Sequence, residues 1–332
     1  MPAASPAARP SEPGIGVGTW AWGNRFLWGY DPSQDHLLEA CFRHAVDRGL
    51  HFFDTADSYG TGRHAGRSEE LLGLFCSRLD AERRQALTVA TKLAPFPWRL
   101  GRQGFRRAFE ASRLRLQGKL DRVQLHWSTA RYLPWQELPL LDGLADLVQE
   151  GQVAAVGVSN LGPQRLQRLD DHLRARGVPL VSVQVQLSLL APQAVAAGGL
   201  ARACRERGIE LIAYSPLALG LLARAPGSQP PSLQGPRALL ARRQWAPIQP
   251  VLQALDRLAE GRAGGPAAVA LNWCRAHGAL PIVGLRNPQQ AEAAAAALGW
   301  QLNPEERDQL DRLAMACVAA GGAMPANPFQ SA

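Results

Sequence analysis

A polar stretch near the start of the sequence carries residue types suited to acid–base chemistry. Residues 50–60 read LHFFDTADSYG, so an apolar run ends abruptly in Asp54, and Tyr59 follows five positions later. The apolar run is typical of a buried strand, and catalytic groups of parallel α/β folds gather in the loops that follow strands. The alternative is that Asp54 caps the next helix and Tyr59 packs in a loop.

Two further candidates, Lys92 and His126, end other strand-like runs. Of the 36 basic residues only Lys92 and Lys119 are lysines and the other 34 are arginines, so Lys92 indicates a site that needs a compact ammonium rather than a guanidinium. The chain also has only four tyrosines, and Tyr59 and Tyr214 both follow predicted strands.

Together these four side chains could protonate a carbonyl oxygen. A phenol with a pKa near ~10 is a weak acid, and we expect the neighbouring ammonium of Lys92 to lower the pKa of Tyr59. Asp54 would keep Lys92 charged and fixed, while His126 would hydrogen-bond the substrate opposite it. No side chain can supply a hydride, so this chemistry implies a nicotinamide cofactor.

The elements that would position these groups alternate between strand and helix. Eight strand-like runs are predicted at residues 15–19, 51–54, 87–92, 122–127, 153–159, 181–187, 209–215 and 280–284, and helical patterns at 34–48, 68–79, 104–116, 138–149, 163–176, 194–207 and 266–277. Several helices end at a glycine, where a left-handed residue is needed: Gly49, Gly151, Gly177 and Gly208. The pattern predicts a (β/α)8 TIM barrel. A doubly wound sheet is the alternative, but the GxGxxG expected of it is missing.

Two segments extend the bare repeat. A Pro-, Gly- and Arg-rich stretch at 226–250 is predicted to be a long loop after strand 7, either a ligand lid or disordered, and is followed by an extra helix at 251–261. A last helix is predicted at 304–316, with Asn303 as its N-cap and Pro304 in its first position.

Composition limits the classes of protein. The net charge of +8 is spread over scattered arginines, which does not indicate nucleic-acid binding, and no apolar run approaches the ~18 residues of a membrane span. Five widely spaced cysteines read as free thiols. Residues 1–13 are predicted to be a disordered tail without signal-peptide character, residues 14–332 a single barrel, and the protein cytoplasmic.

An ordered series of motifs resembles the aldo-keto reductases. These motifs are FDTADSYG, the TK of residues 91–92, QLHWS at 124–128, GVSN at 157–160 and YSPL at 214–217. The resemblance implies a tetrad of Asp54, Tyr59, Lys92 and His126 with Tyr59 as the acid, and NADPH as cofactor. The resemblance further implies that the nicotinamide carboxamide is held by Ser159, Asn160 and Gln184, and that Tyr214 stacks on the nicotinamide ring. It implies that the pyrophosphate is surrounded by Ser215, Leu217 and Gly220. It also implies that Arg286 and Gln290 lie beside the adenosine 2′-phosphate. At the first strand end, Gly18, Thr19 and Trp20 are further cofactor-binding candidates.

Other segments, among them GTWAWGNRFLWGY at 18–30 and ALGW at 297–300, resemble the plant and cyanobacterial pyridoxal reductase-like branch. That resemblance implies reduction of pyridoxal or a similar small aldehyde. Where the family commonly has an acid and an asparagine at adenine, this chain has Ala293 and Ala294. Five aromatic residues are candidates for a flat substrate pocket, each with core packing as the alternative: Trp22, Trp28, Phe96, Trp98 and Trp127.

Two other classes of function compete with a carbonyl reductase. A nucleotide-binding redox-sensing subunit of the same fold would act through a protein partner, but the complete tetrad favours an enzyme. A metal-dependent barrel hydrolase would use His51, Asp54 and His126, but it would want an HxH pair on the first strand, which is missing, so no metal is expected. The expected partner is a small-molecule carbonyl substrate, and the chain is expected to be a monomer or a weak homo-oligomer.

Overall fold

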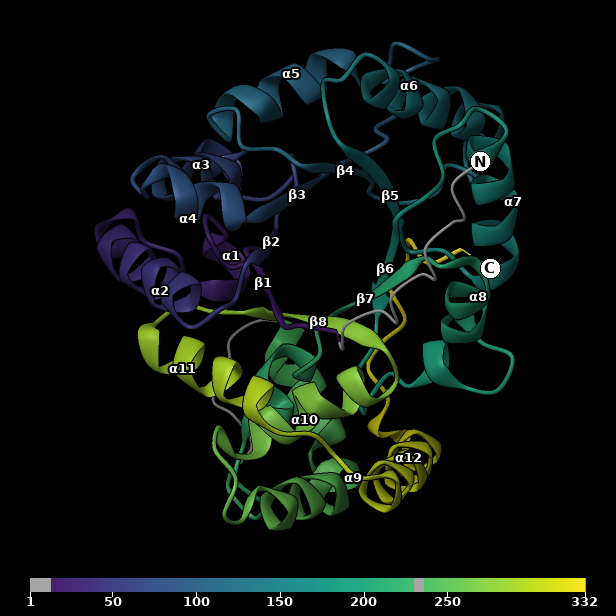
Figure 1. Cartoon of the computed structure of the whole chain (residues 1–332). Coiled ribbons are helices and arrows are strands. Elements are labelled where there is room, and N and C mark those ends of the chain that lie inside the picture. The colour runs from purple at the N-terminus through teal and green to yellow at the C-terminus, as the bar shows by residue number, and fades with distance from the viewer. Residues whose placement is uncertain (1–12, 230–235, 332) are drawn as a thin grey trace, which may run out of the picture.

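The computed structural model describes residues 13–229 and 236–331 and forms a closed barrel of eight parallel strands in sequential order. Figure 1 shows the strands at the centre with helices around them. The strands are β1 Gly16–Gly18, β2 Phe52–Asp54, β3 Thr88–Leu93, β4 Arg122–Leu125, β5 Ala155–Ser159, β6 Ser182–Gln186, β7 Glu210–Tyr214 and β8 Ala279–Gly284. Each lies where the sequence predicts a strand, so the predicted TIM barrel is confirmed.

Strand register brings the candidate residues to one end of the barrel. Because the strands are parallel, their carboxyl ends meet at the same face. Asp54 pairs with Ala90 two residues before Lys92, and Lys92 pairs with Gln124 two residues before His126. On the other side of the barrel Ser159 pairs with Gln184. The fold therefore gathers at one mouth groups that are far apart in the sequence.

The helices cover the outside of the barrel. They are α1 Arg25–Trp28, α2 Asp35–Asp47, α3 Arg67–Ser77, α4 Ala81–Ala86, α5 Arg106–Arg115, α6 Glu137–Gln149, α7 Pro163–Arg174, α8 Leu200–Arg207, α9 Pro236–Ala259, α10 Gly265–Ala276, α11 Pro288–Ala296 and α12 Pro304–Cys317. The predicted glycine after α8 is confirmed, since Gly208 is left-handed with φ 67° and its backbone N–H closes the helix end. The predicted capping of α12 by Asn303 is also confirmed, as a full capping box with Glu306.

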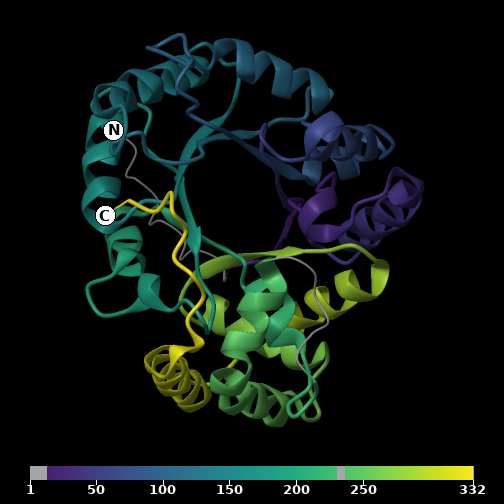
Figure 2. The same ribbon diagram turned by 180° about the vertical axis from the view of Figure 1, so that it is seen from behind.

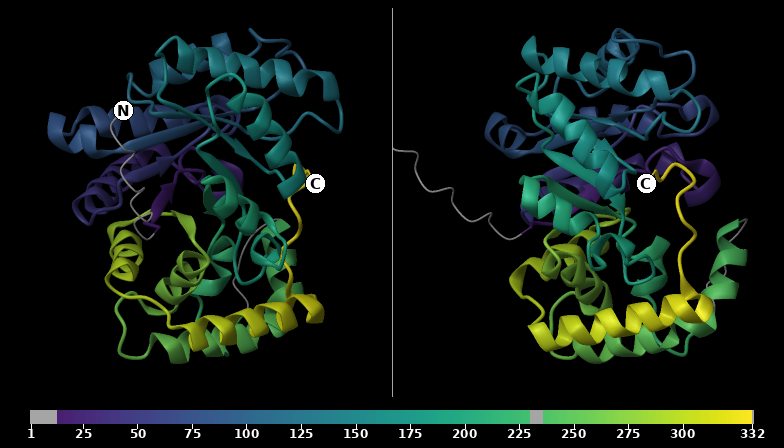
Figure 3. Two further views of the ribbon diagram at one scale, coloured as in Figure 1. Left: turned by 45° about the vertical axis from the view of Figure 1, so that its right-hand side comes forward. Right: turned by 90° about the vertical axis from the view of Figure 1, so that its right-hand side faces the viewer.

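The stretch after β7 is more helical than its sequence indicates. The structure corrects the loop predicted at 226–250, because α9 already begins at Pro236, and residues 230–235 lie outside the described residues. Pro247 and Pro250 lie inside this helix and mask it in the sequence. The burial of Ile248 and Val251 offsets the free-energy cost of the two prolines inside the helix. Figure 3 shows α9 running beside α12 at the base of the molecule, not across the barrel.

Smaller differences follow from weak local signals. Helix α8 starts at Leu200 and not at 194, because residues 193–195 form a single 3₁₀ turn. The short helices α1 and α4 and the alanine-rich α11 have no counterpart among the predicted segments. All five cysteines are buried and free, as predicted. Of the tail predicted at residues 1–13, residues 1–12 lie outside the described residues, and the Pro13 carbonyl accepts a hydrogen bond from Arg275. Within the described residues we find no helix with the length and apolarity of a membrane span.

Candidate functional site

The buried ion pair of Lys92 and Asp54 is the centre of the candidate site. The ammonium of Lys92 donates to Asp54 Oδ1 and to the backbone carbonyl of Thr55, the latter at 2.8 Å. Both charged side chains are only 1% exposed. Burial alone would lower the pKa of Lys92, but Asp54 and Tyr59 outweigh burial and raise that pKa above its ordinary value. Lys92 is therefore an ammonium at neutral pH.

The second oxygen of Asp54 is also occupied. The side-chain amides of Gln124 and Gln184 both donate to Oδ2, each at 2.9 Å. A buried carboxylate is costly unless its lone pairs are satisfied, and here lysine and two amides satisfy them. Sequence reasoning missed Gln124, although its place two residues before His126 on an inward-facing strand could have indicated it. For Gln184 the sequence predicts a cofactor contact, and the structure adds the hydrogen bond from its amide nitrogen to Asp54.

Tyr59 lies in the loop after β2, directly above the ion pair. The Lys92 nitrogen is 5.0 Å from the centroid of the Tyr59 ring, and the His126 ring centroid is 5.9 Å from it. Burial raises the pKa of Tyr59, while the charge of Lys92 and its hydrogen bond act in the opposite direction. The sequence predicts that Lys92 lowers the pKa of Tyr59, but burial outweighs this effect and the pKa is raised. At neutral pH Tyr59 is a protonated phenol, which is the form that can donate a proton.

His126 closes the site as a neutral ring. Its backbone N–H donates to the carbonyl of Leu93 at 3.1 Å, which fixes the residue after β4, and its Nδ1 lies 3.3 Å from the Ser58 hydroxyl. Burial, and then the charge of Lys92, hold the pKa of His126 well below its usual 6.5. A neutral imidazole beside Tyr59 has one ring N–H to offer to a substrate oxygen.

The neutral state of His126 predicts acid sensitivity. Below pH ~6.5 this histidine is protonated in the unfolded chain but stays neutral in the folded chain. The unfolded state therefore binds more protons, and the folded state loses stability as pH falls. We expect the free energy of unfolding of the wild type, relative to His126→Asn, to drop by about 1 kcal/mol or more between pH ~7.5 and ~5. Urea denaturation of both proteins across this range measures it. A constant difference would mean that His126 titrates normally.

A second polar group surrounds Asn160 beside the tetrad. Asn160 adopts a left-handed conformation with φ 62°, and its Nδ2 donates to the backbone carbonyl of His126 at 3.0 Å and to Ser159 Oγ at 3.2 Å. The Tyr214 hydroxyl donates to Asn160 Oδ1 at 2.9 Å. The structure thus brings the predicted residues Ser159, Asn160 and Tyr214 together, next to the tetrad.

The loop after β7 has the backbone of an anion cradle. Ser215, Ala218, Leu219 and Gly220 all have positive φ, between 48° and 92°. Positive φ is costly for residues other than glycine and is found most often at functional sites, and such turns aim backbone N–H groups at one point. Leu217 is half-buried and Gly220 is exposed within this loop. Its conformation fits the diphosphate role predicted for Ser215, Leu217 and Gly220.

The loop after β8 carries the predicted phosphate-binding arginine. Arg286 is exposed, and its guanidinium lies over the Trp28 ring at 5.4 Å. Gln290 stabilises this loop, since its Oε1 accepts from the Arg286 backbone N–H at 2.8 Å. A cavity of about 320 Å³ adjoins Arg286, Trp28 and Tyr30.

The end of β1 contributes mainly internal contacts. The Thr19 hydroxyl lies 2.7 Å from the Ser68 hydroxyl and donates to the Asp54 carbonyl at 3.1 Å. Thr19 is fully buried, and its side chain supports the end of β2, where Asp54 lies. Gly18 and Trp20 are half-buried, and the Trp20 ring lies 6.0 Å from that of Trp28.

Comparison with known proteins decides the family. The model of the aldo/keto reductase family matches residues 14–315. This chain is an aldo/keto reductase. It is 46% identical over 301 residues to the chloroplastic pyridoxal reductase of Arabidopsis thaliana, which covers 90% of this chain and 82% of the relative. The predicted family and its pyridoxal reductase-like branch are thereby confirmed.

Other relatives agree with this assignment. The 6-dehydroglucose reductase of Novosphingobium aromaticivorans is 30% identical over 306 residues, with 88% of this chain and 90% of the relative covered. An aldo-keto reductase of Klebsiella pneumoniae solved in complex with NADPH matches with a TM-score of 0.68 and 26% identity, covering 96% of this chain and 95% of that one. The family makes the chain an oxidoreductase.

The aromatic residues of this aldo/keto reductase divide into wall and core. Phe96 stacks on Trp98 at 4.8 Å and meets Trp127 edge-on at 6.0 Å. Trp127 lies against His126, with ring centroids 4.9 Å apart, so these three aromatics form a wall beside the tetrad. Trp98 is 73% exposed and forms its outer edge.

Two predicted pocket residues lie elsewhere. Trp22 is fully buried against Phe75, and its indole N–H donates to the Leu285 carbonyl at 2.9 Å, so it is a core residue and cannot contact a substrate. The alternation of aromatic and polar residues at 18–30 gives no sign of which ring turns inward. Trp28 lies beside Arg286 and not with the wall formed by Phe96, Trp98 and Trp127.

Sequence reasoning also missed the C-terminal segment, residues 323–331. Figure 2 shows it (yellow) leaving α12 and running along one side of the barrel. Phe329 stacks on Trp127 with ring centroids 4.4 Å apart, and Asn327 hydrogen-bonds Tyr214 and Asn160. The sequence signal is faint, since only a polar and an aromatic residue flank Pro328 there.

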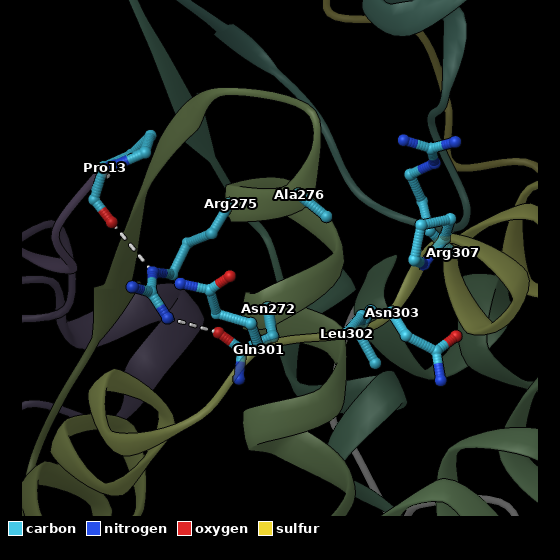
Figure 4. A pocket seen from close by; sticks show the side chains of 9 residues that line it. Pro13, Asn272, Arg275, Ala276, Gln301, Leu302, Asn303 and Arg307 are labelled. Atoms are coloured by element: carbon cyan, nitrogen blue, oxygen red, sulfur yellow. Dashed lines mark hydrogen bonds between the residues drawn. The ribbon is translucent and has the colours of Figure 1, made fainter. Parts of the chain in front are cut away.

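A separate cavity of about 220 Å³ lies at the opposite face (Figure 4). Pro13 precedes β1 and Ala276 precedes β8, so this cavity is at the amino ends of the strands. The Arg275 guanidinium spans it by donating to the Pro13 carbonyl and to Asn272 Oδ1. In a TIM barrel, residues at the amino ends of the strands usually contribute to stability and not to catalysis.

Proposed function

We propose that this chain reduces a small aldehyde or ketone to the alcohol, with pyridoxal as the first candidate and Tyr59 as the proton donor. Membership of the aldo/keto reductase family makes the chain an NADP-dependent oxidoreductase. The observation that carries the rest of the proposal is the contact of the Tyr59 phenol with the Lys92 ammonium, beside the neutral ring of His126.

The residues at the mouth fit a nicotinamide dinucleotide. Tyr214 and Asn160 offer a ring face and an amide beside the tetrad, the positive-φ loop after β7 offers backbone N–H groups to a diphosphate, and Arg286 offers an exposed guanidinium. When bound, the reduced nicotinamide supplies the hydride that no side chain can. At adenine this chain has Ala293 and Ala294 in place of the family's common acid and asparagine.

The side chains would then divide the proton chemistry among them. His126 and Tyr59 hydrogen-bond the substrate carbonyl oxygen and orient it. As negative charge develops on that oxygen, Tyr59 releases its proton to it, and the phenolate left behind is stabilised by Lys92. Asp54 keeps Lys92 charged and in place, and Gln124 and Gln184 keep Asp54 in place. The wall formed by Phe96, Trp98 and Trp127 would pack a flat substrate ring.

A binding and turnover assay tests the proposal. NADPH is titrated by its fluorescence, and its consumption is then followed with pyridoxal first and a panel of other aldehydes and ketones after it. We expect saturable NADPH binding and turnover of at least one flat aldehyde. Tight NADPH binding without turnover of any carbonyl would contradict the enzymatic proposal and favour the redox-sensing subunit.

Arg286 is expected to select NADPH over NADH. A charge-assisted contact to the 2′-phosphate implies that Arg286→Ala weakens NADPH binding roughly 10- to 100-fold and leaves NADH binding unchanged. The Kd values for both cofactors measure this. Arg202→Ala is the matched control, because Arg202 is also exposed but lies on α8, paired with Glu206. An equal loss for both cofactors would show that Arg286 does not contact the phosphate.

A further inference from the structure

The C-terminal segment is anchored at its start, and its end contacts residues at the mouth of the barrel. The buried Gln244 of α9 donates to the carbonyls of Gly322 and Ala323, and the Met324 N–H donates to the Leu190 carbonyl at 2.8 Å. From there the chain runs along the side of the barrel that bears the candidate site (Figure 3). The family model ends at residue 315, so this segment lies beyond the stretch it matches.

The end of the segment binds the polar group around Asn160. The Asn327 amide nitrogen donates to Asn160 Oδ1 at 3.1 Å and to the Tyr214 hydroxyl at 2.6 Å. Farther on, the Ser331 N–H donates to the Asn160 carbonyl at 2.9 Å, and the Gly162 N–H donates to the Ser331 carbonyl at 2.7 Å. The segment therefore contacts both the side chain and the backbone of Asn160.

Asn327 offers the same chemical group as the nicotinamide ring substituent. A side-chain amide and the cofactor's carboxamide are both CONH₂ groups, with one carbonyl acceptor and two N–H donors. Under the proposed function, the Asn160 side chain receives the cofactor's carboxamide and Tyr214 lies against its ring. In the structure the Asn327 amide already uses the Asn160 oxygen and the Tyr214 hydroxyl.

We propose that residues 325–331 form an internal latch, in which Asn327 occupies the nicotinamide carboxamide site until the dinucleotide displaces it. This inference rests on the proposed function. Most of the latch is accessible, since Pro325, Ala326 and Pro328 are exposed and Phe329 remains 47% exposed despite its stacking on Trp127, while Ser331 at its end is buried. Because Ser331 is the one buried residue of 325–331, the segment separates at a lower cost in free energy than a core element.

The first test compares the NADPH affinity of matched variants of the full chain. Asn327→Ala removes both hydrogen bonds to Asn160 and Tyr214, so we expect the Kd for NADPH to fall about tenfold relative to the wild type. Gln330→Ala is the control, because the Gln330 side chain makes no hydrogen bond within the described residues, and its Kd should stay within about twofold of the wild type.

The outcomes separate the latch from the function it rests on. If wild type and variants bind NADPH with the same Kd, or Asn327→Ala binds it more weakly, the latch is wrong and the proposed function stands. If none of the proteins binds NADPH, both are wrong.

Hydrogen exchange with and without NADP⁺ gives an independent readout. The amides of Phe329 and Ser331 are hydrogen-bonded in the structure, to Asn327 Oδ1 and to the Asn160 carbonyl. A latch that opens predicts faster exchange at residues 325–331 when NADP⁺ is bound, with residues 106–115 of the outer helix α5 as an unchanged internal reference. Slower exchange at 325–331 would mean that the segment closes over the cofactor instead, and would overturn the proposal.

Discussion

Replacing Tyr59 by phenylalanine is expected to lower kcat for carbonyl reduction by roughly 10³-fold, with NADPH affinity unchanged. The substitution removes one hydroxyl and keeps the ring, whose contact with His126 stays in place. The proton that the carbonyl oxygen needs must then come from water. Because burial keeps the phenol protonated, the wild-type rate should also be insensitive to pH across the neutral range.

Tyr30→Phe is the matched control for Tyr59→Phe. The Tyr30 hydroxyl is also engaged, donating to Asp35 at 2.8 Å and accepting from Arg67 at 3.0 Å, but it lies away from the tetrad. Its kcat should stay within about threefold of the wild type. If Tyr59→Phe turned over at a normal rate, Tyr59 would not be the proton donor.

Replacing Lys92 by methionine is expected to remove both turnover and stability. Methionine fills a similar volume without charge, so the phenolate of Tyr59 loses its stabilising ammonium, and we expect kcat to fall by roughly 10²-fold or more. Asp54 is left buried without its ion-pair partner, which should cost about 3 kcal/mol of folding free energy. Steady-state kinetics and urea denaturation measure the two effects separately.

Two further variants separate chemistry from stability at this position. Lys119→Met removes the other lysine of the chain, which pairs with Asp121 at 3.0 Å, and should change stability by less than about 1 kcal/mol with normal turnover. Lys92→Met combined with Asp54→Asn removes the unpaired carboxylate and should regain stability without regaining activity. Recovery of turnover in that double variant would show that the ammonium has only a structural role.

Much of the fold is predictable because local and global signals agree. The eight strands are short apolar runs that end in polar residues, and helices with glycine ends separate them, so period alone gives the barrel. The same logic places Asp54, Lys92 and His126 at strand ends, where the structure brings them together. Helix α9 defeats this logic, since Pro247 and Pro250 read as helix breakers while tertiary burial of its apolar face keeps the helix intact.

The details of the site depend on three-dimensional neighbours that a sequence does not display. Nothing in the sequence shows that Gln124 and Gln184 converge on one Asp54 oxygen across the barrel. The pKa of Tyr59 depends on how far burial outweighs the charge of Lys92, which only the packing decides. The C-terminal segment reaches Asn160 from 167 positions away through residues with no periodic pattern.

A crystal structure of the chain with NADP⁺ and an unreactive carbonyl compound tests the central claim most directly. The account predicts that the carbonyl oxygen lies within hydrogen-bonding distance of both the Tyr59 hydroxyl and a His126 ring nitrogen. It also predicts that the nicotinamide lies against Tyr214, at hydride-transfer distance from the carbonyl carbon. A nicotinamide bound away from Tyr214, or a carbonyl oxygen out of reach of Tyr59, would contradict it.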